Sequence, residues 1–368
     1  MSSNRLSPRS RESKILSFLD IPFPKTRYQG SKLRLLNWFF PIFHELNFDT
    51  VLDALGGSAA VSHLFKRMEK KVTYNDILTS NYYISKGLIA NKSTRFSLKL
   101  VPSLFKKKND FHYSSVIQDQ FKDIYYTDEE NKLLDTIVQN IFRLENQYEK
   151  SLCFFALFQA CLQKRPFNIF HRRNLNLRMN NVRRSFGNLK TWNTPFLELF
   201  QRAMIEANQA IFDNNRTNTA MNYCIFKVPI PDDGYDLVYL DPPYISEKGV
   251  GVDYYSFYHF LEGIIHYYQW EELIDFKTKH RRLKTVPNKW STVGENLQAF
   301  EEVIAKFQDS IIVISYREPG IPSIGELKDI LLSYKVSVNV YKKNYKYALT
   351  KRHQTVNEIL LVAKSNKQ

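Results

Sequence analysis

Residues 235–244 read YDLVYLDPPY, a mostly apolar run that leads directly into Asp241-Pro242-Pro243-Tyr244. An almost continuous apolar run is typical of a strand buried on both faces of a parallel sheet. The two prolines lack a backbone N–H and cannot extend the ladder, so we expect the strand to end at Asp241. Ligands of open α/β sheets bind where the parallel strands end. The stretch therefore predicts a binding site beside Asp241.

The chemistry of this tetrad suits an amine. The Asp241 carboxylate and a carbonyl oxygen held by the prolines are two hydrogen-bond acceptors, and N6 of adenine has two N–H donors to match them. Such pairing raises the electron density on the nitrogen and directs its lone pair at an electrophile. Tyr244 offers a ring on which a base rotated out of a duplex can stack. The alternative is an ordinary turn, because Asp and Pro are common where strands end.

A second strand-and-turn signal lies upstream. Val51–Asp53 is a short apolar strand, and Gly56-Gly57 follow in a turn of small residues that lets backbone approach a ligand closely. A helical pattern comes next, and then a strand that ends at Asp76, where an acid can bind a ribose hydroxyl. The chain lacks the glycine-lysine loop that cradles a triphosphate, which favours a nucleoside without phosphates, such as S-adenosylmethionine.

A third motif, KTRYQGSK at residues 25–32, precedes a predicted helix. Gly30-Ser31 can cap that helix, and Lys32 can reach a cofactor carboxylate. The alternative is an ordinary helix start with surface lysines.

The remaining pattern fixes the fold class. Ile311–Tyr316 and Glu358–Ala363 are further buried strands, whereas residues 127–162 contain a capping box and two apolar helices. We therefore predict an α/β protein with a Rossmann-like sheet and helices on both faces. The sheet domain is expected over residues 21–95 and 221–368, with a mainly helical inserted domain over 96–220 and a basic flexible arm over 1–20.

Composition favours a polyanionic partner. The 368 residues carry a formal net charge of +15, which points to nucleic acid. Three cysteines are too few for a disulfide framework or a closed zinc site, so we expect a reducing cytoplasm and no metal. No apolar run approaches the length of a membrane helix.

The segment from Gln163 to Lys190 is basic and contains no Asp or Glu. Arginine pairs with guanine and asparagine with adenine in the major groove, so this mixture can grip and read DNA. The alternative is a solvated charged face, although such faces usually mix both signs. The residues expected to contact DNA are Lys164, Arg165, Arg172, Arg173, Asn174, Arg178, Arg183 and Arg184.

In their order along the chain, these motifs resemble the DNA adenine methylase family of the alpha class, over roughly residues 25–363. The resemblance implies an S-adenosylmethionine-dependent methyltransferase fold. It implies cofactor contacts from Tyr28, Lys32, Asp53, Gly56, Gly57, Asp76, Ile225 and Asp241, and a target-base site formed by Asp241, Pro242, Pro243 and Tyr244. Two positions depart from the family pattern: Ala59 stands where a glycine is more usual, and Leu55 replaces an aromatic residue.

We therefore expect a monomeric enzyme that transfers a methyl group from S-adenosylmethionine to N6 of a flipped adenine in duplex DNA, with a cognate restriction endonuclease as a possible partner. The rival interpretations are an RNA or protein-amide methyltransferase and an inactive DNA-binding protein on the same scaffold. Residues 245–260 are expected to form a mobile loop over the base. Within that stretch, His259 is expected to be packed in the protein or to touch a phosphate rather than to act as a general base, because amine attack on a sulfonium needs no strong base.

Overall fold

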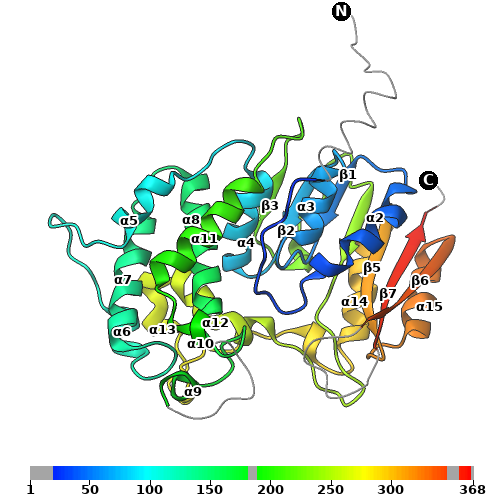
Figure 1. Cartoon of the computed structure of the whole chain (residues 1–368). Coiled ribbons are helices and arrows are strands. Elements are labelled where there is room, and N and C mark those ends of the chain that lie inside the picture. The colour runs from blue at the N-terminus through cyan, green and yellow to red at the C-terminus, as the bar shows by residue number, and fades with distance from the viewer. Residues whose placement is uncertain (1–19, 181–188, 346–355, 366–368) are drawn as a thin grey trace, which may run out of the picture.

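The computed structural model describes residues 20–180, 189–345 and 356–365. A seven-stranded sheet with the order β3-β2-β1-β4-β5-β7-β6 forms one side of the molecule (Figure 1). Its strands are β1 (Thr50–Asp53), β2 (Lys71–Asn75), β3 (Thr219–Met221), β4 (Leu237–Leu240), β5 (Ile311–Glu318), β6 (Ser337–Tyr345) and β7 (Val356–Lys364).

The strands from β3 to β5 run parallel, and β7 runs antiparallel between β5 and β6. In the register, Asp53 stands opposite Tyr74 on β2 and Tyr239 on β4. Because all three strands end at the same edge of the sheet, Asp53, Asp76 and Asp241 lie together there. The predicted strands before Asp53, Asp76 and Asp241 are thereby confirmed, whereas β3 and β6 were not predicted.

Two apolar layers cover the sheet, as expected for an α/β fold with helices on both faces. Val51, Tyr239 and Val313 face one layer, and Leu52, Val238 and Ile312 face the other, as side chains alternate along a strand. The first layer includes η1 (Lys32–Leu35), α2 (Leu36–His44), α3 (Ala60–Arg67), α4 (Thr79–Ser85) and η2 (Lys86–Ala90). The second includes η4 (Ile225–Lys227), η6 (Lys289–Ser291), α14 (Asn296–Lys306) and α15 (Ile324–Tyr334).

The segment between β2 and β3 adds a helical lobe beside the sheet (Figure 1). The predicted capping box is present, with Thr127 accepting from the Glu130 N–H and Glu130 accepting from the Thr127 N–H. The lobe contains η3 (Leu98–Leu100), α5 (Val101–Leu104), α6 (Val116–Gln120), α7 (Asp128–Phe142), α8 (Gln147–Gln163), α9 (Leu175–Met179), α10 (Leu189–Asn193) and α11 (Phe196–Gln209).

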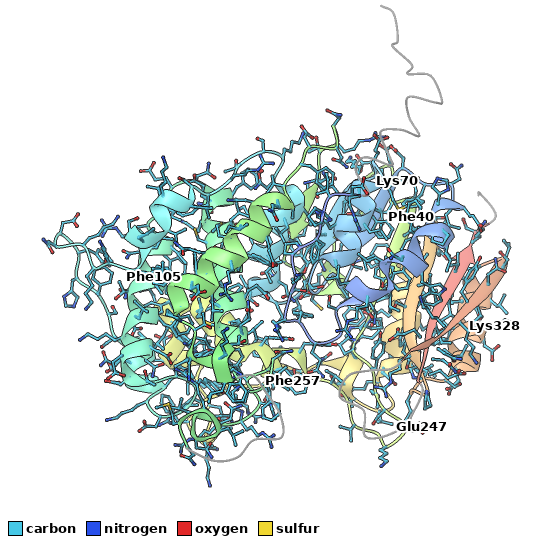
Figure 2. All side chains as sticks on the ribbon, viewed as in Figure 1. Phe40, Lys70, Phe105, Glu247, Phe257 and Lys328 are labelled. Carbon is cyan, nitrogen blue, oxygen red and sulfur yellow. The ribbon has the colours of Figure 1, made fainter. Side chains whose placement is uncertain are left out.

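The lobe and the first layer share one continuous core, because α8 is buried along most of its length and packs against α4 and α11. The expected boundary at residue 220 falls inside β3. A further difference concerns three helices that were expected with the sheet but pack on the lobe: α12 (Tyr254–Ile265), η5 (Tyr267–Gln269) and α13 (Trp270–Leu273). The rings of Phe260 and Trp270 contact the Phe121 ring of the lobe, at centroid distances of 5.0 and 4.8 Å. Figure 2 shows the side chains of both parts, with Phe105 in the lobe and Phe40 on α2.

None of the helices in the described ranges is long and apolar enough to cross a membrane.

Close packing of α12 on α13 gives a stability prediction. A Cβ at Gly263 would lie 1.9 Å from the Trp270 ring, whereas one at Gly325, in α15, would meet nothing closer than Ser323 Oγ at 3.8 Å. We expect Gly263→Ala to lower the free energy of unfolding by about 1–3 kcal/mol through overpacking. Gly325→Ala should be neutral or slightly stabilising. Urea titration of both variants checks this, and equal stabilities would contradict it.

Candidate active site

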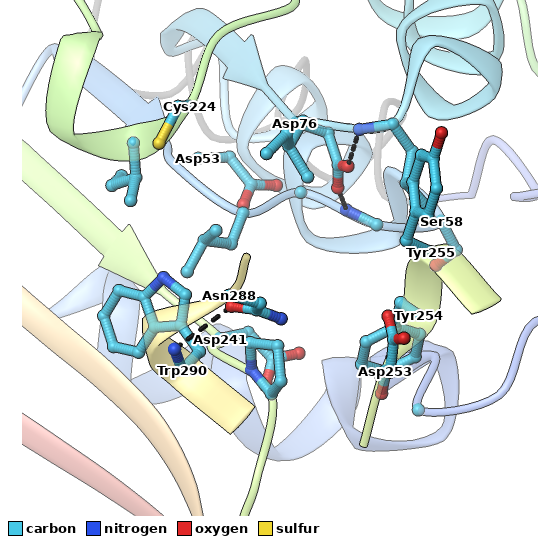
Figure 3. Close-up of a pocket in the computed structure, with 18 of the residues that line it drawn as sticks. Asp53, Ser58, Asp76, Cys224, Asp241, Asp253, Tyr254, Tyr255, Asn288 and Trp290 are labelled. Atoms are coloured by element: carbon cyan, nitrogen blue, oxygen red, sulfur yellow. Dashed lines mark hydrogen bonds between the residues drawn. The ribbon is translucent and has the colours of Figure 1, made fainter. Parts of the chain in front are cut away.

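A cavity of about 570 Å³ opens at the carboxyl edge of the sheet (Figure 3). Its volume is in the range of small-molecule sites, about 300–1,000 Å³. The cavity collects side chains from segments far apart in the sequence. Every residue expected to contact a cofactor lines it: Tyr28, Lys32, Asp53, Gly56, Gly57, Asp76, Ile225 and Asp241. Pro243 lines it too, whereas Pro242, which is buried, is not among the lining residues.

The turn after β1 needs its small residues. A Cβ at Gly56 would lie 2.1 Å from the Tyr74 ring, and Gly57 has a φ of +49°. Ala59, where the related family more often has glycine, has a φ of +66° and is the N-cap of α3. Ala59 therefore adopts the left-handed backbone conformation that glycine adopts easily, and for an alanine this conformation has a cost in free energy.

Asp53 is a buried carboxylate with one unused oxygen. Its Oδ2 accepts a 2.6 Å hydrogen bond from Ser62 Oγ, but Oδ1 has no hydrogen-bond partner among the described residues. Burial raises the pKa of Asp53 to about 7, although the Ser62 hydroxyl opposes this shift. A buried oxygen without a donor beside a cavity is a place for a ligand's donor or positive charge.

Asp76 closes the glycine turn. Its Oδ2 accepts from the Gly57 N–H at 2.9 Å and its Oδ1 from the Leu78 N–H at 2.8 Å. Burial raises the pKa of Asp76 to about 6, against the lowering effect of these backbone donors. The carboxylate is thus fixed in orientation at the rim of the same cavity, as expected for an acid at the end of β2.

Asp241 is held on one oxygen. Its Oδ1 lies 3.1 Å from Lys32 Nζ and accepts a 2.8 Å hydrogen bond from Tyr244 OH, and Lys32 also donates to Tyr244 OH. Burial raises the pKa of Asp241, and the Lys32 ammonium acts against that shift. The Lys32 side chain is 4% exposed, and its ammonium group is directed to Asp241. The tyrosine of the tetrad therefore anchors the carboxylate in this structure, through its hydroxyl.

Sequence reasoning missed a wall of stacked tyrosines. The Tyr28 ring stacks on Tyr258 at 4.7 Å and on Tyr254 at 5.9 Å between centroids, and Tyr254 lines the cavity. The expected mobile loop over residues 245–260 is wrong in its second half, because α12 begins at Tyr254. The Asp253 side chain caps α12 by accepting from the Ser256 N–H. The aromatic run at residues 254–258 was the available signal.

The opposite wall was predicted only in part. Ile225 and Phe226 line the cavity, as the resemblance implies for residues beside a cofactor ring. Phe226 stacks on Trp290, whose ring centroid is 6.1 Å away, and Trp290 comes from a segment to which no role was assigned. No short-range pattern links residues 226 and 290, so only the fold reveals this pair.

Among the described residues, three of the six cations of the basic segment are bound inside the protein, namely Lys164, Arg165 and Arg178. Glu130 binds Lys164 at 2.9 Å and Arg178 at 2.6 Å, and Arg165 lies buried against the rings of Tyr125 and Phe170. Asn174 is also buried. Arg172 and Arg173 are exposed, while Arg183 and Arg184 lie outside the described residues. The acid that pairs with Lys164 and Arg178 comes from α7, so the absence of acids within the segment did not reveal this pairing.

His259 is packed inside the protein, which is one of its two expected roles. It is buried, and its Nε2 lies 2.8 Å from Tyr125 OH and 3.0 Å from the carbonyl oxygen of Phe170, within the helical lobe. Burial lowers its pKa well below the usual value.

Comparison with known proteins agrees with this geometry. The type II methyltransferase M2.HphI of Haemophilus parahaemolyticus is 26% identical over 336 residues, which cover 89% of this chain and 93% of the relative. M.NlaIII of Neisseria lactamica is 21% identical, with 82% and 86% covered. M.FokI of Planomicrobium okeanokoites is 26% identical over 90% of this chain, which spans about half (51%) of that longer protein.

A family model matches residues 28–318, which include residues 28–32 of the N-terminal motif, the glycine turn, the helical insert and the Asp-Pro-Pro-Tyr tetrad. The chain belongs to the D12 class of N6 adenine-specific DNA methyltransferases.

Proposed function

We propose that this adenine-specific DNA methyltransferase binds S-adenosylmethionine in the cavity at the sheet edge and receives there an adenine rotated out of duplex DNA. The observation that carries the proposal is the convergence of Asp53, Asp76 and Asp241 on one cavity. Rotation of the base is needed because N6 is occupied by base pairing inside a duplex.

The cavity fits the cofactor's chemistry. When bound, S-adenosylmethionine supplies a methyl group on a positively charged sulfonium. Asp53 offers an unpartnered carboxylate oxygen to a cationic ligand, and Asp76 lies where a ribose would be held. Ile225 and Phe226 supply apolar surface for an adenine ring.

Asp241 is prepared for the target amine. Lys32 and Tyr244 both hold Oδ1, and no hydrogen bond within the described ranges involves Oδ2. That oxygen is left to accept one N6–H, while the carbonyl oxygen of Pro242 accepts the other. Fixing the amine this way supplies proximity and orientation, the main sources of acceleration for a single displacement.

Removing the Asp241 carboxylate tests its role. We expect Asp241→Ala to reduce single-turnover methyl transfer to duplex DNA by at least about 10²–10³-fold, as loss of a group that contacts the reacting atoms does. Binding of DNA should change little, and urea melts of the variant measure how much stability is lost when the buried Lys32 loses its closest acid. Asp232→Ala, an exposed acid on the approach to β4, is the matched control. Wild-type activity in Asp241→Ala would reject the assignment, and parallel assays with RNA and protein test the rival substrates.

Binding of the cofactor should depend on pH through Asp53. Its pKa is about 7, so lowering the pH through 7 protonates the carboxylate that faces a cationic ligand. We expect the Kd for S-adenosylmethionine to rise by up to about tenfold per pH unit between pH 7 and 6. In Asp53→Asn, binding should be weaker at pH 8 and much less dependent on pH. Calorimetric titrations at several pH values measure this, and an unchanged pH dependence in the variant would contradict it.

The described part of the basic segment gives a matched comparison for DNA contact. Arg172 and Arg173 are exposed, whereas Arg178 is paired with Glu130. Arg172→Ala and Arg173→Ala should each weaken DNA binding and reduce the slope of log K against log salt by about 1. Arg178→Ala should instead lower the free energy of unfolding by about 1–3 kcal/mol, because it breaks charge-assisted hydrogen bonds. Fluorescence anisotropy at several salt concentrations, with urea melts, separates the two effects.

A further inference from the structure

Glu358 is a buried acid that the reaction as described does not use. Its side chain is 1% exposed, and neither carboxylate oxygen accepts a hydrogen bond within the described part of the chain. Its Oε2 lies 3.8 Å from Lys32 Nζ, the same nitrogen that lies 3.1 Å from Asp241 Oδ1. A buried carboxylate is costly unless it is paired, so this residue requires an explanation.

The topology of the sheet explains how Glu358 reaches the site. Because β7 runs antiparallel to β5, its first residues lie at the edge where β4 ends. Glu358 is the third residue of β7 and stands opposite Arg317 on β5 and Lys343 on β6. Lys32, at the start of η1, is therefore placed between an acid from β4 and an acid from β7.

This placement has an electrostatic consequence. A lysine paired with one carboxylate forms a neutral pair, which weakens that carboxylate as an acceptor. A second carboxylate gives the three side chains Asp241, Lys32 and Glu358 a net negative charge, while Arg317 on β5 acts on Glu358 from the neighbouring strand. During methyl transfer the bond from N6 to the methyl carbon forms as the bond from that carbon to the donor's sulfur breaks, so the sulfur becomes neutral and the positive charge moves to N6 until N6 releases a proton to water. Beside Asp241, a net negative environment favours that charge.

We propose that Glu358 is a positioning residue for methyl transfer: it shares Lys32 with Asp241, so that Asp241 stays aimed by Lys32 and yet remains a strong acceptor for the target amine. This inference rests on the proposed function of Asp241. Glu358 acts through Lys32 and does not touch the substrate.

The expected sign of a pH effect follows from the surrounding charges. The charged groups that face Glu358 are Lys32, Asp241, Arg317 and Lys343. Three more titratable groups act on Lys32 or Asp241, namely Tyr244, Tyr254 and Asp53. Removing the negative charge of Glu358 favours ionisation of Asp241, because it removes a nearby like charge. Lys32 then interacts with Asp241 without a competing carboxylate. Both changes lower the pKa of Asp241, so the acid limb of the rate profile should move to lower pH.

Glu358→Gln keeps the shape of the side chain and removes its charge. With cofactor and duplex DNA saturating, we expect its single-turnover rate at the pH plateau to fall about tenfold, less than for loss of a group that contacts the reacting atoms. The acid limb should shift to lower pH, and the Kd values for DNA and S-adenosylmethionine should stay unchanged. Glu358→Asp keeps the charge but moves it away from Lys32 by one methylene group, so its single-turnover rate should lie between those of Glu358→Gln and the wild type.

Lys32→Met tests whether Glu358 acts through Lys32. In that background Glu358→Gln should cause little further loss, because the shared cation is gone, whereas additive losses would overturn the inference. An unshifted acid limb, or a loss confined to melting temperature and KM, would overturn it as well. If the wild-type chain transferred no methyl group to DNA, the proposed function would fail together with this inference. An active wild type with an indifferent Glu358→Gln would reject this inference alone.

Discussion

The parallel register of β2, β1 and β4 is the constraint on which the rest of the structure depends. It aligns Tyr74, Asp53 and Tyr239 across three strands, so that the acids at or just beyond the strand ends share one edge. A one-residue slip would turn each strand's side chains to the opposite faces and separate these acids. The two apolar layers hold the register, because Val51 and Leu52 are committed to different cores.

The electrostatics of the edge then follow from burial. Desolvation raises the pKa of Asp53, Asp76 and Asp241 alike. The cavity therefore places acids that are costly to ionise around a space that suits a cationic cofactor, and a ligand's charge recovers part of that cost. Lys32 makes Asp241 different from the other two, since it is the cation that lies directly on this carboxylate. In the proposed function, one cavity thus combines acceptors for the cofactor with an acceptor oriented for the target amine.

Sequence reasoning succeeded where the signal was local. The strand before Asp241, the turn at Gly56-Gly57 and the capping box at Thr127 each occupy a few consecutive residues, and the structure contains all of them. It failed where partners are distant in the chain. Glu130 neutralises Lys164 and Arg178 from another helix, Trp290 covers Phe226, and Glu358 reaches Lys32 across the sheet. The aromatic start of α12 was predicted as part of a mobile loop because Gly249 and Gly251 lie just before it, whereas the structure has a helix capped by Asp253.

The most direct test of the central claim is a crystal structure of this chain with S-adenosylhomocysteine and a duplex that contains the target adenine. The account predicts an extruded adenine whose N6 lies within hydrogen-bond distance of Asp241 Oδ2 and of the Pro242 carbonyl oxygen, with Oδ1 still on Lys32 and Tyr244. A complex in which N6 contacts neither acceptor, or in which the cofactor lies away from Asp53 and Asp76, would contradict the account.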